Sequence, residues 1–152
     1  MKKLMMIVGL TFGLMAGGNI SPVVPVDNSV TNPEFTPYFG TGSAYAVDAK
    51  DYYGLVLAGI EYKGFIGIEG RYYTQFDKYG DVLGIYIKPK YTFNNGVGVY
   101  GLLGGERTYL KNITVDSWAA GGGVEYKNFF VDGVYNDKFD DTKVVVGYRI
   151  RF

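Results

Sequence analysis

The chain has 152 residues, with 15 basic and 15 acidic side chains, no histidine and no cysteine. Without cysteine there is no disulfide framework, thiolate metal site or thiol nucleophile, and without histidine the commonest general base and metal ligand is missing. No basic excess is present to neutralise nucleic-acid phosphates. We therefore predict no enzymatic activity, no cofactor or metal, and no nucleic-acid partner.

The first 18 residues have the pattern of a cleavable signal peptide. Lys2 and Lys3 precede an apolar run over 4–15, and small residues follow at 16–18. The run is shorter than the roughly 20 apolar residues that a membrane-spanning helix needs. The proline-rich residues 19–34 should form neither a helix nor a central strand. The sequence predicts export, followed by an extended periplasmic tether.

From residue 35 onward, turn signals divide the chain into eight apolar or alternating segments. Most are about 9–11 residues long, which suits a tilted strand crossing a bilayer. We predict strands over 35–45, 54–62, 65–76, 82–93, 97–108, 117–126, 129–136 and 143–152.

The predicted connections alternate in length. Short turns at 62–65, 93–96 and 126–129 contain Gly, Asn or Lys, as tight hairpins do. Longer polar loops are predicted at 47–53, 77–81, 109–116 and 137–142. Short turns at one end and longer loops at the other are typical of outer-membrane proteins. The predicted fold is all-β: residues 35–152 form an eight-stranded antiparallel up-and-down transmembrane β-barrel.

Within the predicted strands, apolar and charged residues occupy opposite faces. In the last strand, Val144, Val146 and Ile150 alternate with Gly147, Arg149 and Arg151. The charged face is interleaved with glycine, and aromatic residues gather at strand ends, where membrane-interface girdles lie. We therefore predict that the apolar face contacts lipid. The predicted interface aromatics are Tyr62, Phe65, Tyr91, Phe93, Trp118, Tyr126 and Phe129.

The charged face then points into a lumen that side chains can fill, because an eight-stranded barrel is narrow. Buried charges are tolerated when they are paired, so we predict a salt-bridge network that plugs the interior. Glu106 and Arg107 are adjacent and only one can point inward without a bulge, which leaves their orientation open. The predicted lumen network is Glu61, Glu69, Arg71, Lys88, Lys90, Glu125, Asp132, Arg149 and Arg151.

The leader, the tether, the eight alternating segments and the ending Tyr148-Arg149-Ile150-Arg151-Phe152 resemble one known group. It is the porin-like family of small Gram-negative outer-membrane β-barrels that includes the OmpA transmembrane domain and the opacity-type proteins. In that family a last strand ending in Phe signals to the barrel-assembly machinery. The resemblance implies that Tyr148, Ile150 and Phe152 carry this role here.

Three functions remain open at this point. The first is a monomeric outer-membrane barrel, embedded in lipid, with a structural or surface-interaction role and a plugged lumen. The second is a narrow porin that passes small solutes or ions. The third is a soluble periplasmic barrel that binds a ligand inside, in which the apolar face would point inward instead.

Overall fold

The computed structural model describes residues 34–75 and 80–152. The predicted signal peptide and all of the predicted tether except Glu34 lie outside the described residues. Eight strands are present: β1 Phe35–Ala46, β2 Asp51–Tyr62, β3 Ile66–Gln75, β4 Asp81–Thr92, β5 Val97–Tyr109, β6 Thr114–Tyr126, β7 Phe129–Asn136 and β8 Asp141–Arg151. In these described ranges, no helix is long and apolar enough to cross a membrane.

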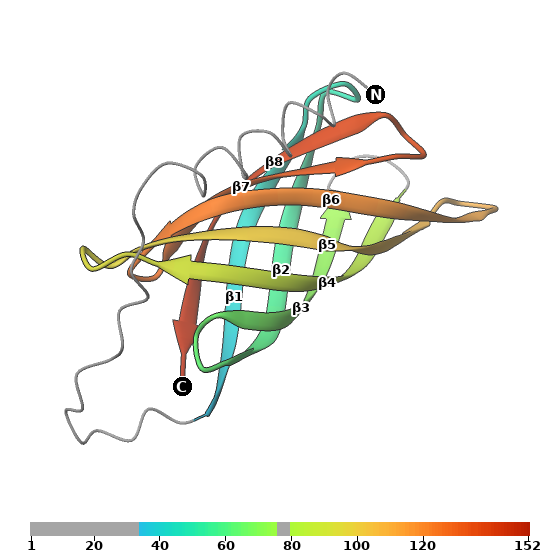
Figure 1. Cartoon of the computed structure of the whole chain (residues 1–152). Helices are drawn as coiled ribbons and strands as arrows, with labels where there is room; N and C mark the ends of the chain where they lie inside the picture. Colours follow the sequence, from blue (N-terminus) through green and yellow to red (C-terminus); the bar gives the residue numbers. More distant parts are fainter. Residues whose placement is uncertain (1–33, 76–79) are drawn as a thin grey trace.

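The strands form one closed barrel in which each strand pairs antiparallel with the next (Figure 1). The pairing of β8 with β1 closes the barrel, with Tyr38 opposite Arg151 and Gly40 opposite Arg149. The predicted eight-stranded antiparallel up-and-down architecture is confirmed.

The two ends of the barrel differ. The turns after β2, β4 and β6 lie at one end, here called the turn end, together with Glu34 and Phe152. Strands β1, β3, β5 and β7 end at the opposite end, here called the loop end. In the β2–β3 turn, Lys63 and Gly64 both have positive φ, 48° and 73°. Two consecutive positive φ values define the type I′ turn, which matches the twist of paired strands. The backbone angles of this turn are therefore those of the tight hairpin predicted at 62–65.

At the loop end, three strands begin two or three residues earlier than predicted. Strands β2, β6 and β8 begin at Asp51, Thr114 and Asp141, whereas polarity placed their starts at 54, 117 and 143. The cross-strand partners continue through these polar residues, from Ala46 opposite Asp51 to Tyr109 opposite Thr114. Side-chain polarity marks where the apolar wall ends, while the backbone ladder continues beyond it.

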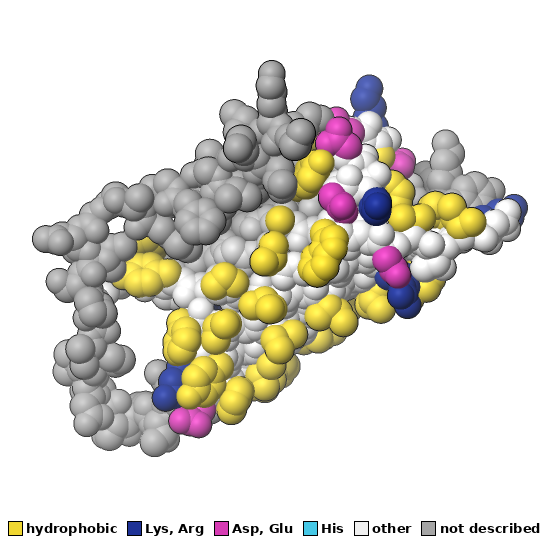
Figure 2. All heavy atoms as spheres, turned by 45° about the vertical axis from the view of Figure 1, so that its right-hand side comes forward, with side chains coloured by type: hydrophobic (Ala, Val, Ile, Leu, Met, Phe, Trp, Pro, Cys, Tyr) yellow, Lys and Arg dark blue, Asp and Glu magenta, His cyan; other side chains and the backbone are white. Residues whose placement is uncertain are grey.

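Apolar side chains cover the outside of the barrel wall, whereas the inside holds buried charged side chains together with apolar ones such as Leu57 and Val145. On the outside, apolar side chains are exposed, for example Ile85 at 62 % and Leu103 at 61 %. On the inside, Glu69 and Arg71 are at most 1 % exposed. Figure 2 shows one side of the molecule, where apolar side chains spread over the wall and charged side chains lie toward its ends. This is the reverse of the pattern in a protein folded in water.

The lumen is crowded, and glycine makes room for its larger side chains. A Cβ atom at Gly147 on β8 would lie 2.5 Å from the Phe130 ring and 2.6 Å from the Thr41 carbonyl oxygen. Real Cβ atoms do not approach that closely, so the ring of Phe130 occupies the space that a side chain at position 147 would need. The glycines of the charged face are thus part of the packing.

Candidate functional site

The candidate site is the lumen, where the structure places all nine of the predicted charged residues on the inner side of the wall. They come from β2, β3, β4, β6, β7 and β8 and lie in two adjoining sections along the barrel axis. A third section, which the sequence analysis did not predict as a group, lies toward the loop end.

The turn-end section consists of Glu61, Lys88, Lys90, Glu125 and Arg151. Lys88 and Lys90 on β4 reach the two carboxylate oxygens of Glu61 on β2, with Nζ–O distances of 2.9 and 2.6 Å. Glu125 on β6 accepts hydrogen bonds from Lys90 at 3.1 Å and from Arg151 at 2.5 Å. Three basic side chains share two carboxylates, so this section carries one excess positive charge.

The central section joins opposite sides of the barrel. Arg71 on β3 donates from Nη1 and Nη2 to Asp132 on β7, at 2.9 and 2.7 Å, and from Nε to Glu69 at 2.6 Å. Two tyrosines add hydrogen bonds to these carboxylates. The Tyr100 hydroxyl donates to Asp132 at 2.8 Å, and the Tyr38 hydroxyl donates to Glu69 at 2.7 Å. Bidentate arginine–carboxylate pairing fixes geometry as well as charge.

Arg149 connects the central and turn-end sections. Its Nη2 lies 3.1 Å from Glu69 and its Nη1 donates to Glu125 at 2.9 Å. The guanidinium carbon lies 3.9 Å from the centre of the Phe130 ring and 4.9 Å from that of Tyr100. Cation–π contact stabilises such a group where water is absent. Within the described residues, Arg149 Nε is the buried side-chain nitrogen that has no hydrogen-bond partner.

The loop-end section centres on Glu106. Its carboxylate accepts hydrogen bonds from Lys143 Nζ at 2.6 Å, from Asn136 Nδ2 at 2.6 Å and from the Tyr86 hydroxyl. All four side chains are buried. The Asn136 amide also reaches Ser117 Oγ at 2.7 Å, so a continuous polar layer crosses the barrel here.

The structure answers the question that the sequence left open at positions 106 and 107. Glu106 points inward, and Arg107 points outward, where it donates to Asp116 at 2.7 and 3.0 Å. No bulge is needed, because β5 and β6 keep one register from Val97 to Tyr109. Lys143 lies on the same face as Arg149 in the alternating pattern of the last strand. Sequence reasoning missed it because its position stood at the edge of a predicted loop.

Buried tyrosines are among the other inner residues that the predicted lumen network did not include. Tyr38, Tyr73, Tyr86 and Tyr100 are at most 3 % exposed, and their hydroxyls all bind side chains of the charged sections. Tyrosine fits this lumen because its ring fills space and its hydroxyl satisfies a charged partner. A signal was available for Tyr73 and Tyr86, since each has the parity of the charged face in its strand, whereas β1 contains no charged residue that could indicate the face of Tyr38.

A cavity of about 410 Å³ opens at the loop end of the lumen. Asn136 and Lys143 line its inner side, and Tyr53, Asp141 and Phe139 are among the residues higher in its wall. The paired side chains of the loop-end section therefore close the inner end of this open cavity.

The predicted interface aromatics lie on the outer wall. Six of them flank the three turns of the turn end, and Trp118 lies near the loop end with 73 % of its surface exposed. Neighbouring rings contact one another edge-on, with centroids 5.8 Å apart for Tyr62 and Phe65 and 5.1 Å apart for Tyr91 and Phe93. The last-strand residues Tyr148, Ile150 and Phe152 are also on the outer face and exposed.

Comparison with solved structures identifies the same architecture in membrane proteins. The outer-membrane protein Ail of Yersinia pestis in a phospholipid bilayer nanodisc matches with a TM-score of 0.54 and 18 % identity, covering 78 % of this chain and 100 % of that one. The N-terminal β-barrel domain of Pseudomonas aeruginosa OprF matches with a TM-score of 0.57 and 17 % identity, covering 78 % and 98 %. A de novo designed transmembrane β-barrel matches with a TM-score of 0.56 and 17 % identity, covering 77 % and 95 %.

The chain has the fold of the small outer-membrane β-barrels. No model of a known protein family matches the sequence, and no curated protein sequence matches it significantly. At these identities the likeness concerns the fold: eight strands closed around a narrow interior. The residues that fill that interior must be interpreted from this chain alone.

Proposed function

We propose that this protein is an integral outer-membrane β-barrel with a structural or surface-interaction role, and that paired charges plug its lumen. The observation that carries the proposal is the inverted wall. Buried Arg71, Glu69 and Lys88 lie inside, while a belt of exposed isoleucine, leucine and valine covers the outside. A soluble barrel would expose its charges and bury its apolar side chains, whereas lipid makes the opposite arrangement stable.

The first test is a heat-shift experiment on isolated outer membranes. Lipid-embedded barrels stay folded in detergent and migrate compactly on a gel until they are boiled. We expect the protein in the outer-membrane fraction, with a heat-dependent change in migration. A soluble periplasmic protein without this shift would overturn the proposal and favour a ligand-binding barrel.

Two observations and one physical argument support a plugged lumen. Each section spans the interior with side chains from different strands, as Arg71 and Asp132 do across the centre. With Arg149 counted in the central section, basic and acidic groups are equal in number there and in the loop-end section, and a single positive charge is left over at the turn end. Charges paired in this way stay in place, because removing one partner leaves an uncompensated charge that costs several kcal/mol.

A narrow porin is the second candidate, and the loop-end cavity favours it. That cavity of about 410 Å³ already opens the outer part of the lumen, so a pore would need only the three sections to rearrange. Conductance in a planar lipid bilayer separates the two functions. Silence is expected for the plugged barrel, and steady single-channel steps from the unaltered protein would establish the pore instead.

The exposed last-strand residues fit the assembly role implied by the family resemblance. Tyr148, Ile150 and Phe152 share one face, and Phe152 is 74 % exposed at the turn end. An exposed aromatic at a strand end is available to a partner before the barrel closes. We include recognition by the barrel-assembly machinery in the proposed function.

A further inference from the structure

A hollow on the outer wall has a specific cause in the sequence. On β5, Gly105 lies between its two cross-strand partners, Ile85 on β4 and Trp118 on β6. All three positions face outward, and a Cβ atom added at Gly105 would meet only the Ser117 carbonyl oxygen, at 3.7 Å. The missing side chain therefore leaves an open gap between a large aliphatic and a large aromatic side chain.

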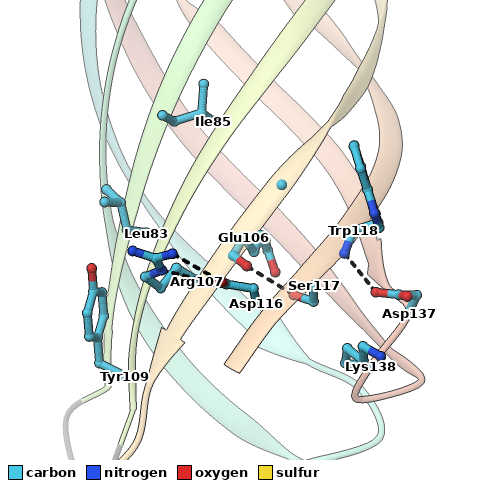
Figure 3. A pocket seen from close by; sticks show the side chains of 11 residues that line it. Leu83, Ile85, Glu106, Arg107, Tyr109, Asp116, Ser117, Trp118, Asp137 and Lys138 are labelled. Atoms are coloured by element: carbon cyan, nitrogen blue, oxygen red, sulfur yellow. Dashed lines mark hydrogen bonds and ion pairs between the residues drawn. The ribbon is translucent and has the colours of Figure 1, made fainter. Parts of the chain in front are cut away.

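This gap connects two hollows that differ in chemistry. The one toward the barrel middle, about 320 Å³, is bordered by the apolar side chains of Ile68, Ile87 and Leu103. The one toward the loop end, about 620 Å³, reaches the charged residues Arg107 and Lys138. Both hollows are also lined by Ile85 and Trp118, so they form one groove, here called the Gly105 groove. Figure 3 shows its loop-end part.

The polar end of the Gly105 groove offers a free cation. Asp116 is bound by Arg107 through two hydrogen bonds, and Asp137 accepts the Trp118 backbone N–H at 2.8 Å (Figure 3). Both of these carboxylates thus already have donors, and the Glu106 carboxylate points into the lumen, where Lys143 binds it. Within residues 34–75 and 80–152, no carboxylate pairs with the Lys138 ammonium. The unsatisfied group at this end is a donor with positive charge, which complements an anionic oxygen.

We propose that the Gly105 groove binds one membrane lipid with an anionic phosphate headgroup. The acyl chain would lie in the apolar hollow over Gly105, against Ile85 and Trp118, and the phosphate would be held by Lys138 beside the Arg107–Asp116 pair. The order of these parts matches that of a lipid, since the charged pair Arg107 and Asp116 lies two residues beyond Gly105 and Trp118 toward the loop end, on the same outer face. Basic residues near a membrane surface attract anionic lipids, and tryptophan prefers the interface. The inference rests on the proposed membrane location.

Trp118 provides a direct test, because it is the only tryptophan in the chain. The protein purified from membranes is reconstituted into phosphatidylcholine vesicles that contain a minor fraction of phosphatidylglycerol with brominated acyl chains. Bromine quenches tryptophan fluorescence on contact. The reference is the same fraction of brominated phosphatidylcholine, whose headgroup has no net charge. We expect the anionic lipid to quench up to about fivefold more effectively, since one basic residue at the surface contributes about that factor.

Two variants and a matched control assign the effect to the groove. Lys138→Gln, an exposed turn substitution, should lower quenching by the anionic lipid to the level of the neutral one. Gly105→Leu should fill the hollow and weaken quenching by both lipids. Gly133→Leu adds the same side chain elsewhere on the outer wall, where a Cβ atom meets nothing within 4 Å, and should change neither. A heat shift on gels checks that each variant is folded.

The outcomes separate the inference from the function on which it rests. Equal quenching of the unaltered protein by the two brominated lipids would overturn the proposal that the Gly105 groove binds an anionic lipid, and would leave the membrane location intact. Quenching by neither lipid would mean that Trp118 does not contact acyl chains, which would overturn both. Preference for the anionic lipid that survives Lys138→Gln would overturn the assignment of Lys138 as the headgroup contact.

Discussion

Arg71 and Asp132 face each other across the lumen, from β3 and β7, and are joined by two parallel hydrogen bonds of 2.9 and 2.7 Å. Their side chains have no exposed surface, and the Asp132 carboxylate also accepts the Tyr100 hydroxyl. This contact ties together parts of the wall that are not neighbours in the sheet. It should therefore contribute to stability beyond what the backbone ladder provides.

Asp132→Ala is expected to lower the free energy of unfolding by about 3–5 kcal/mol, because Arg71 would keep a buried charge without its main partner. Urea unfolding in lipid vesicles measures the change. The matched control is Asp116→Ala, which breaks the solvent-exposed pair with Arg107 and should cost about 0–1 kcal/mol. Similar losses for the two variants would contradict a buried role for Asp132.

Opening the lumen should require changes in more than one section. Arg149→Ala leaves the loop-end layer of Glu106 and Lys143 in place, so we expect it to stay silent in a planar bilayer. Adding Glu106→Ala and Lys143→Ala removes the loop-end pair, but Arg71 and Asp132 still cross the centre of the lumen, so this triple variant should also stay silent. Steady conductance from the folded triple variant would argue against a plug formed by all three sections. Full conductance from Arg149→Ala alone would mean that Arg149 by itself closes the lumen.

Two glycines on opposite faces of the wall should respond differently to alanine. Gly147→Ala would collide with the Phe130 ring and the Thr41 carbonyl, so we expect a loss of about 1–3 kcal/mol in unfolding free energy. Gly133→Ala has open space around its Cβ and should be neutral or stabilising by about 0.5–1 kcal/mol. If both substitutions cost the same, crowding in the lumen would not explain the inward glycines.

Because apolar side chains cover the outer face, the cost in stability of a charge placed there should depend on its depth in the membrane. Ile87→Arg, in the middle of β4, should cost about 2–4 kcal/mol in a bilayer, and Phe93→Arg, at the turn end, about 0–1 kcal/mol. Unfolding titrations in vesicles of one lipid composition give both numbers. If the wall faced water instead, neither arginine would be costly, and the difference between the two sites would vanish.

Phe152→Ala should affect assembly and leave the folded barrel stable. The Phe152 side chain is exposed, and its backbone N–H bond to the Pro37 carbonyl at 3.0 Å does not need the ring. Unfolding free energy should therefore change by no more than about 0.5 kcal/mol. Pulse labelling of cells should show slower appearance of the heat-shifting form than for Phe93→Ala, another aromatic at the turn end. Equal rates of appearance for the two variants would contradict an assembly role for Phe152.

Sequence patterning was sufficient for the fold because a strand has a period of two residues. In β8 the alternation of Val144, Val146 and Ile150 with Arg149 and Arg151 indicated both the strand and its two faces. Strand starts such as Asp51 were harder to place, because polar residues beyond the apolar belt continue the ladder.

The candidate site was predictable as a set of residues, but its pairing was not. Parity gives the face of Glu69 or Asp132, while the partner across the lumen depends on the stagger of all eight strands. The same limit applied to Glu106, whose direction depends on the register of β5 against β6. Inward tyrosines such as Tyr38 were missed because an aromatic residue suits both the lipid interface and a polar interior.

Closure of the barrel by β8 and β1 brings the two ends of the described strands together. Residues 37 and 152 are hydrogen-bonded neighbours at the turn end, so a short linker between residues 152 and 35 would be one more hairpin like the three already there. New ends could then be made in any loop-end connection. Such circular permutants should fold into the same barrel, because the wall is a ring in which no strand is intrinsically first.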